Sequence, residues 1–203
     1  MRRALPTGLY GILDVDLLGE AGVIAAASAF RPAGVVQLRA KGLSARQMVA
    51  LAREVKAALG SNGPPFFIND RADVAAIVGA DGVHLGQDDI TPAAARAILG
   101  PDAIVGLSTH SVAQAITALD VDYVAIGPVF PTRTKRDAEP VVGLDGVRAV
   151  RAQVRCPLVA IGGIDLERAP AVRAAGADLV AMIGALLIGD VPRNVALALE
   201  RCR

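Results

Sequence analysis

Two clusters of acidic and amide side chains stand at the ends of two successive apolar segments. Asn69 and Asp70 follow the apolar residues 66–68, and Asp89 closes a Gln-Asp-Asp run that follows residues 82–85. If both segments are parallel strands about 4.8 Å apart, their carboxyl ends meet at one rim, where carboxylates could bind a hard cation. Both Asp residues could instead be turn residues or helix caps, because Asp favours those positions. The repetition on two successive strands favours the cation site.

Residues 35–41 alternate between polar and apolar side chains in an unusual way. Gln37, Arg39 and Lys41 share one face of this predicted strand, and the residues between them, up to Ala40, are apolar. If the apolar face meets the helices of a barrel, the polar face points inward, where unpaired cations are costly and need an anionic partner. The alternative is an edge strand with one solvated face. This alternative is excluded if the strand has a neighbouring strand on each side.

Further polar groups follow other apolar segments. Residues 108–110 are Ser-Thr-His, and the longest loop, residues 130–142, carries the polar run 132–135. Loops of this length in compact barrels are often functional. A glycine pair at 162–163 and a single glycine, Gly184, follow the last two apolar segments. Glycine at such a position lets the backbone approach a phosphate closely. Glycine pairs also serve in ordinary turns, but their place after the seventh strand favours a phosphate site.

Eight apolar segments alternate with eight helical segments, which predicts an α/β fold, a single (β/α)8 TIM barrel formed as one domain by residues 1–203. The polar clusters fall at the carboxyl ends of the strands, where such barrels place their chemistry. The predicted strands are residues 9–15, 35–41, 66–68, 82–85, 103–107, 123–129, 158–161 and 179–183. The predicted helices are residues 21–30, 45–59 after a cap at Ser44, 72–78, 92–99 after a cap at Thr91, 112–119, 143 or 145 to 154, 166–175 after a cap at Asp165, and 192–201.

The composition narrows the class of protein. The 203 residues are 53% hydrophobic and only 3% aromatic, which suits parallel strands covered by Ala-rich helices. The formal net charge of +1 gives no electrostatic argument for a nucleic-acid or membrane partner. Cys156 and Cys202 lack metal-ligand spacing. No apolar run reaches the roughly 20 residues of a membrane span and no signal peptide is recognisable, so we expect a cytoplasmic protein. A homo-oligomer is left open.

Several motifs together resemble the thiamine phosphate synthase family. The resemblance runs from about Leu9 to Gly189, with the motifs in the family's order. Any one motif would be modest support, whereas the set is highly specific. The motifs are QLRAK at 37–41, FFINDRADVA from 66, GADGVHLGQDD ending at 89, VGLSTHS from 105, YVAIGPVFPTRTK ending at 135 and AIGGI at 160–164.

The resemblance implies a (β/α)8 barrel that acts on two small-molecule substrates. Such enzymes join hydroxymethylpyrimidine diphosphate to hydroxyethylthiazole phosphate, release diphosphate and require Mg2+, by a dissociative path through a pyrimidine carbocation. Arg39, Ser108 and Lys135 would be catalytic, acting on the diphosphate. By the same resemblance, the pyrimidine diphosphate would be bound by Gln37, Arg39, Lys41 and Asn69, and its diphosphate group by Ser108 and Lys135. The thiazole phosphate would be bound by Thr132 and Thr134 and, through the backbone, by Gly162, Gly163, Ile183 and Gly184. Magnesium would be held by Asp70 and Asp89.

Two positions depart from the family pattern. The family usually has an acidic residue in place of Ala40, which we expect to face the helices with little effect. It usually has Ser in place of Gly184. The backbone N–H of Gly184 could still bind phosphate, but the affinity for the thiazole phosphate would fall if the Ser hydroxyl contributes to binding. We interpret His84, within a predicted strand, as structural, and we leave the role of His110 open.

Two other functions remain to be weighed. A thiazole tautomerase of the same fold carries a His in the place of His110, but such relatives tend to lack the magnesium carboxylates and the TRTK-type loop. A non-catalytic phosphate-binding barrel, a sensor or scaffold, need not retain Lys135 or both Asp70 and Asp89. This chain has all of these residues, which favours the synthase.

Overall fold

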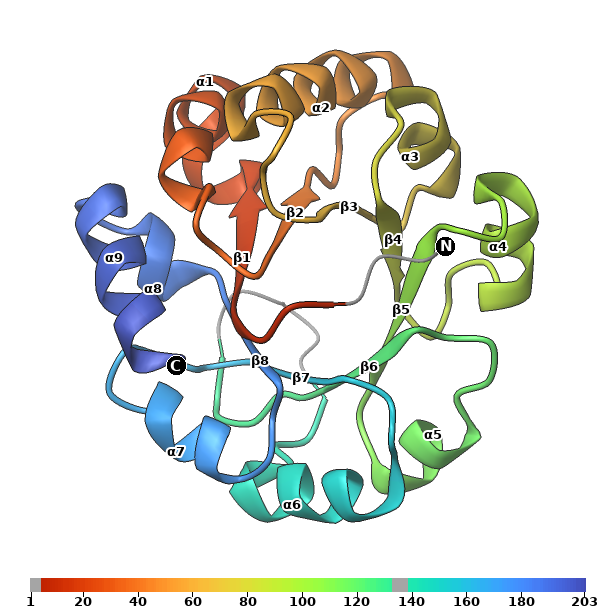
Figure 1. Cartoon of the computed structure of the whole chain (residues 1–203), viewed down its shortest axis with the longest axis vertical. Helices are drawn as coiled ribbons and strands as arrows, with labels where there is room; N and C mark the ends of the chain where they lie inside the picture. The colour runs from red at the N-terminus through yellow and green to blue at the C-terminus, as the bar shows by residue number, and fades with distance from the viewer. Residues whose placement is uncertain (1–4, 133–138) are drawn as a thin grey trace.

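The computed structural model describes residues 5–132 and 139–203, in which eight parallel strands form a closed barrel (Figure 1). Each strand pairs with the next along the chain, and β1 closes the barrel against β8. All eight predicted strands are confirmed, with ends that differ by a few residues. They are β1 (Gly8–Asp14), β2 (Val35–Arg39), β3 (Phe66–Asn69), β4 (Gly82–Leu85), β5 (Ile104–Thr109), β6 (Tyr123–Ile126), β7 (Leu158–Ile161) and β8 (Leu179–Met182).

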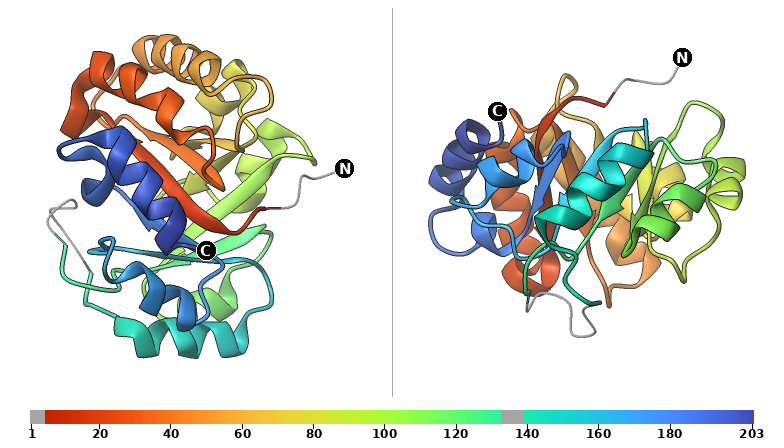
Figure 2. Two further views of the ribbon diagram at one scale, coloured as in Figure 1. Left: turned by 60° about the vertical axis from the view of Figure 1, so that its left-hand side comes forward. Right: turned by 90° about the horizontal axis from the view of Figure 1, so that it is seen from below.

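Helices surround the strands on the outside of the barrel, as the side views show (Figure 2). The fold class predicted from the sequence, a (β/α)8 barrel, is therefore confirmed. No helix in the described ranges is long and apolar enough to cross a membrane. The helices are α1 (Val15–Ala27), the short 3-10 helix η1 (Ser28–Phe30), α2 (Ala45–Leu59), α3 (Ala72–Val78), α4 (Pro92–Leu99), α5 (Val112–Thr117), α6 (Gly143–Gln153), α7 (Ala169–Ala174), α8 (Gly184–Leu187) and α9 (Val191–Arg201).

Local capping explains which helix boundaries were predicted correctly. Ser44 and Thr91 each accept a hydrogen bond from a backbone N–H of the first turn, and α2 and α4 begin where the sequence predicts. By contrast, α7 begins at Ala169 rather than at residue 166. The Asp165 carboxylate accepts from the N–H groups of Glu167 and Arg168, so it caps a turn that precedes the helix.

Two further helix predictions were incomplete. The first helix begins at Val15, six residues before the predicted start, and contains Gly19 with a φ of 68° and a ψ of 169°. This glycine lets two short helical pieces join across a kink, which the sequence pattern does not reveal. The four-residue helix α8 was not predicted, because so short an element has no periodicity to detect.

Alternate side chains of the strands face one apolar cluster inside the barrel or two clusters outside it, as the alternation in residues 35–41 predicts. Leu38 and Ala40 pack in the larger outer cluster with residues of the helices, and Ala40 is 4% exposed. Gln37, which precedes Leu38, points into the barrel and is 2% exposed. The inner cluster is formed by Tyr10, Ile12, Val35, Phe67, Ile104, Tyr123, Ala125, Val159, Leu179 and Ala181.

Aromatic rings fill the centre of the barrel. The Tyr10 and Tyr123 ring centroids are 6.2 Å apart, and Phe67 stacks on Tyr123 at 5.9 Å. Tyr123 lies over Gly106 of β5, where any Cβ would overlap the Tyr123 ring. The position of this ring therefore depends on glycine at 106.

We predict that Gly106→Ala destabilises the protein by about 1–3 kcal/mol, because the added methyl forces the Tyr123 ring out of its place in a close-packed core. Denaturant unfolding with matched controls measures the loss. Gly184→Ala is the control, since a Cβ there lies 3.7 Å from its nearest neighbour, in ordinary van der Waals contact. Equal stability of the two variants would contradict this account of the core.

Candidate active site

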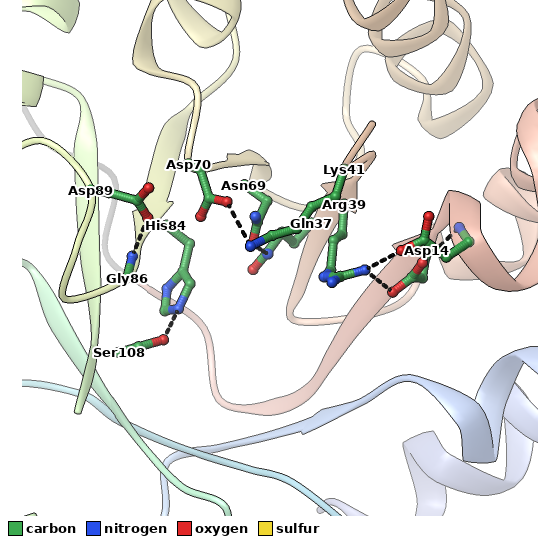
Figure 3. Close-up of polar contacts among 11 residues, drawn as sticks. Asp14, Gln37, Arg39, Lys41, Asn69, Asp70, His84, Gly86, Asp89 and Ser108 are labelled. Carbon is green, nitrogen blue, oxygen red and sulfur yellow. Dashed lines mark hydrogen bonds and ion pairs between the residues drawn. The ribbon is translucent and has the colours of Figure 1, made fainter. Parts of the chain in front are cut away.

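The carboxyl ends of β1 to β5 bring together charged and amide side chains from distant parts of the sequence (Figure 3). The close-up shows Asp70 and Asp89 near each other, with Lys41, Asn69 and Gln37 alongside them. The predicted meeting of the clusters after β3 and β4 is therefore present in the structure.

The two carboxylates lie close enough for Asp89 to perturb the ionisation of Asp70. Burial and the neighbouring Asp89 carboxylate raise the pKa of Asp70 from 3.8 to about 6, against the opposing effect of Lys41. The Lys41 ammonium lies 3.3 Å from Asp70 Oδ2. Asp89 is fixed by a 2.6 Å hydrogen bond that its Oδ2 accepts from the Gly86 N–H. The rim therefore holds two like charges at short range, with one cation beside them.

This arrangement fits a divalent cation that prefers oxygen ligands. Asp70 and Asp89 offer hard carboxylate oxygens, and a cation between them would relieve their mutual repulsion. Within residues 5–132 and 139–203, no group of three or more His, Cys, Asp or Glu side chains is placed to hold a metal ion. A metal bound here would therefore complete its coordination with water or with oxygens of a ligand.

The protein itself supplies an anion for Arg39, a point that the sequence reasoning missed. Arg39 Nη1 lies 2.8 Å from Asp14 Oδ2 and 3.0 Å from Asp16 Oδ2. Asp14 is fully buried, and its other oxygen caps α1 by accepting from the Asp16 N–H. The sequence feature that could have indicated this ion pair is a carboxylate, Asp14, at the end of the first strand. The inward cation is therefore paired before any ligand binds.

A chain of hydrogen bonds crosses the barrel beneath the rim and uses one side chain from each of β1 to β6. The sequence reasoning missed Tyr10 and Tyr123, because aromatic residues within strands are typical of an apolar core. The feature that could have indicated them is a phenol hydroxyl on the strand face that points into the barrel. We call this set the polar chain. Its successive bonds join Asn69 Oδ1 to Gln37 Nε2 (2.7 Å), Gln37 Oε1 to the Tyr10 hydroxyl (2.6 Å), the Tyr10 and Tyr123 hydroxyls (2.9 Å), the Tyr123 hydroxyl to His84 Nδ1 (2.8 Å), and His84 Nε2 to Ser108 Oγ (2.8 Å).

The two histidines have different surroundings. His84 is buried in the polar chain, and this burial lowers its pKa from 6.5 to about 4. It is both part of the core and a direct neighbour of Ser108, so it supports the site as well as the fold. His110 lies beyond Ser108, where its Nδ1 is 2.6 Å from the Gly127 carbonyl oxygen.

The glycine turns after β7 and β8 leave backbone N–H groups available. Gly163 has a φ of 63°, and a Cβ there would lie 2.7 Å from the Phe130 carbonyl oxygen. The N–H groups of Gly163 and Gly184 form no hydrogen bond with another described residue. Gly162 and Ile183 lie directly beside these two residues. Such paired glycine turns can hold a phosphate through the backbone.

An arginine joins the turn after β7 to the start of the long loop. Arg168 Nη1 donates to the Gly163 carbonyl oxygen at 2.8 Å, and its guanidinium lies 4.7 Å from the centre of the Phe130 ring. The Phe130 N–H also donates to the Gly162 carbonyl oxygen at 2.9 Å. Thr132, two residues further on, is therefore brought towards the glycine turn. The predicted ligands Thr134 and Lys135 lie outside the described residues.

A closed barrel with charged, amide and glycine groups gathered at the carboxyl ends of its strands defines a (β/α)8-barrel enzyme site. A family model described as thiamine monophosphate synthase matches residues 9–186. The chain belongs to this family, and it is therefore a transferase of thiamine biosynthesis, as the sequence predicted.

Individual relatives agree with this assignment. The thiamine-phosphate synthase of Koribacter versatilis is 47% identical over 191 residues, 89% of each chain, and that of Azorhizobium caulinodans is 46% identical over 203 residues, 96% of each chain. The structure of thiamine phosphate pyrophosphorylase from Pyrococcus furiosus is 33% identical with a TM-score of 0.87, covering 97% of this chain and 95% of that one.

We predict that His84 makes stability depend on pH in a specific direction. Its pKa is about 4 in the folded protein and about 6.5 when unfolded. The unfolded chain therefore binds a proton that the folded chain does not, so stability present above roughly pH 6.5 is lost as pH falls towards 4, by at most about 1.4 kcal/mol per pH unit. Unfolding free energies of the wild type and His84→Gln across this range measure the difference.

The comparison with His84→Gln removes contributions that both proteins share. The raised pKa of Asp70 acts in the opposite direction, because its stabilising effect is present below its unfolded value of 3.8 and is lost as pH rises towards about 6. Both proteins contain Asp70, so its effect cancels in the difference. Parallel pH profiles of the two proteins would contradict a neutral, buried His84.

Proposed function

We propose that this chain joins hydroxymethylpyrimidine diphosphate to hydroxyethylthiazole phosphate, giving thiamine phosphate and diphosphate. The bond from the pyrimidine methylene carbon to the diphosphate oxygen breaks, and the thiazole nitrogen bonds to that carbon. The observation that carries the proposal is the pair of carboxylates, Asp70 and Asp89, beside Lys41 at the rim of a barrel of this family. Carboxylates for a metal and a cation for phosphate are what a metal-bound diphosphate requires.

The pyrimidine diphosphate would lie across the ends of β2 and β3. Gln37 and Asn69 offer amide groups at the inner end of this region, which suit the polar edge of an aminopyrimidine. Arg39 and Lys41 extend from the same strand face towards the rim, where Lys41 is 55% exposed. Because their present partners are carboxylates of the protein, both cations are already oriented when a diphosphate arrives.

Asp70 and Asp89 would hold Mg2+, and when bound the ion neutralises negative charge on the departing diphosphate. Two carboxylates are too few to hold magnesium tightly, since it prefers an octahedral oxygen shell. We therefore propose that the protein binds this ion well only together with a diphosphate.

The remaining proposed ligands act on the two phosphate groups. Ser108 and Lys135 would bind the leaving diphosphate and stabilise its growing negative charge. Thr132 and Thr134 would contact the thiazole phosphate. Backbone N–H groups of the two glycine turns would hold the same phosphate, and the available N–H groups at Gly163 and Gly184 support this role, with Gly162 and Ile183 beside them.

The reaction needs charge stabilisation and alignment more than a strong base. The family resemblance implies a dissociative path, in which carbon–oxygen cleavage precedes attack by the thiazole nitrogen. A buried His84 that stays neutral near pH 7 suits such a site, since it adds no competing positive charge beneath the forming carbocation. Holding the thiazole nitrogen against the carbon by its phosphate supplies the alignment.

The other candidate functions use fewer of these groups. A thiazole tautomerase needs no paired metal carboxylates, and a phosphate sensor needs no leaving-group cation. Relatives that carry the synthase name at 46–47% identity support the synthase. Both substrates are small phosphorylated molecules, which supports the cytoplasmic location expected from the sequence.

The test is an assay of the purified protein with both substrates and Mg2+. We expect thiamine phosphate and diphosphate in equal amounts, detected by chromatography. Isomerisation of a thiazole phosphate precursor without condensation would identify a tautomerase instead. Binding of the phosphates without any product would identify a non-catalytic barrel.

We predict that Asp70→Asn and Asp89→Asn each lower turnover at least about 100-fold, the loss typical of an electrostatic group that acts on a leaving group. Both variants should keep the fold, because Asn adopts the positive φ of 63° at residue 70 and can still accept the Gly86 hydrogen bond at residue 89. Asp88→Asn is the matched control and should lose little activity. A damaging Asp88→Asn beside a harmless Asp89→Asn would refute the assignment.

A further inference from the structure

The polar chain, from Asn69 through Gln37, Tyr10, Tyr123 and His84 to Ser108, has a single hydrogen-bond direction. The Gln37 amide donates to Asn69 through Nε2 and presents Oε1 to Tyr10. A carbonyl oxygen can only accept, so the Tyr10 hydroxyl must donate its one proton to Gln37. Tyr10 then accepts at its contact with Tyr123, and the Tyr123 proton is used there. The orientation of one amide therefore fixes two hydroxyl groups.

The same reasoning fixes the His84 tautomer. Because Tyr123 has donated its proton to Tyr10, it can only accept from His84 Nδ1 at 2.8 Å. The buried ring is neutral near pH 7, since its pKa is about 4, and a neutral ring has one N–H. His84 Nε2 must therefore accept, and the Ser108 hydroxyl must donate to it across 2.8 Å.

This direction leaves Ser108 unsuited to bind an anion. Its proton points inward to His84, and only oxygen lone pairs face away from that bond. A phosphate oxygen needs a donor, and lone pairs opposed to it would repel. For Ser108 to donate to an anion without leaving the buried His84 Nε2 unpaired, Nε2 must carry the ring proton and donate to the Ser108 oxygen. Each earlier member of the chain must then reverse as well.

We propose that Tyr10, Tyr123 and His84 are positioning residues for Ser108, and that an anion bound at Ser108 reverses the polar chain as a unit. The inference rests on the proposed binding of diphosphate by Ser108. In the reversed chain, His84 Nε2 donates to Ser108, Tyr123 donates to His84 Nδ1, Tyr10 donates to Tyr123, and the Gln37 amide turns to donate to Tyr10.

The reversal conserves protons and charge. The His84 Nδ1–H bond breaks and an Nε2–H bond forms, so the ring stays neutral, while the two phenols and the Ser108 hydroxyl keep their protons and rotate. Turning the Gln37 amide places its oxygen against Asn69, which must then donate through its own NH2 group. Ser108 on β5 and Asn69 on β3 are therefore coupled, although they bind different parts of one substrate.

Nitrogen NMR of the imidazole rings tests the proposal directly. The protein contains only two histidines, and His110 serves as an internal reference, because its Nδ1 faces the Gly127 carbonyl oxygen and must carry the proton in a neutral ring. We expect His84 to be the Nδ1–H tautomer in the ligand-free protein. Saturation with inorganic diphosphate and Mg2+ should convert it to the Nε2–H tautomer, while His110 keeps its own.

Calorimetric titration of the same probe separates this inference from the proposed function. If diphosphate binds and the His84 tautomer does not change, the reversal is wrong and the diphosphate site stands. If diphosphate does not bind, both the diphosphate site and the reversal that depends on it are wrong. Ser108→Ala should leave His84 as Nδ1–H with and without diphosphate, because no hydroxyl remains to reverse.

Tyr10→Phe gives a readout that a merely structural role would not produce. This change removes the link between Gln37 and Tyr123 and keeps the ring, so the Tyr123–His84–Ser108 end can reverse without turning the Gln37 amide. We expect ligand-free His84 to shift towards Nε2–H and diphosphate to bind about fivefold more tightly, the size of a modest coupling between sites. Weaker or unchanged binding would overturn the coupling.

Thr109→Val is the matched control. Thr109 is the next residue of β5, is fully buried, and donates its hydroxyl to the Ala125 carbonyl oxygen on the other face of the strand. The variant therefore loses a buried hydrogen bond of comparable kind without touching the polar chain. Its His84 tautomers and its diphosphate affinity should match those of the wild type, and a Tyr10→Phe-like response in this variant would contradict the proposal.

Discussion

Each polar side chain inside this barrel must find a hydrogen-bond partner, because an unpaired polar group in a dry interior is strongly unfavourable. Apart from Tyr10 and Tyr123, the members of the inner cluster are apolar side chains such as Phe67 and Ile104, which offer no such partner. The Gln37 amide, two phenols and the His84 imidazole can therefore satisfy one another only by bonding from strand to strand. This requirement ties the register of six strands to one another and links the apolar floor of the barrel to the polar rim above it.

The rim is organised by a second balance, between cations and carboxylates. Arg39 lies against the buried Asp14, and Lys41 lies near Asp70. These pairs hold the cations in place without a ligand, so the charges are arranged before substrate arrives. They also mean that an incoming diphosphate competes with carboxylates of the protein. A metal ion at Asp70 and Asp89 would reduce that competition, because it would occupy the carboxylate that Lys41 otherwise contacts.

Much of this arrangement could be predicted from the sequence, since it depends on local patterns. Alternation placed Gln37 inside the barrel, and caps at Ser44 and Thr91 fixed two helix starts. The ion pair between Arg39 and Asp14 could not be predicted, because it joins residues on two strands whose relative register appears only in the folded barrel. The same holds for the polar chain: the inward register of Tyr10 and Tyr123 could be predicted, but the partners of their hydroxyls could not, because they lie on other strands.

The backbone at Asp70 narrows the choice of residue there to one. Its φ of 63° lies in the left-handed region, which Gly, Asn and Asp adopt readily and longer side chains adopt at a cost. Gly and Asn would satisfy the backbone but carry no negative charge. Glu would carry the charge but would strain the backbone and extend its carboxylate by one methylene group. The backbone conformation and the need for a negative charge thus restrict the residue at position 70 independently, and aspartate alone meets both requirements.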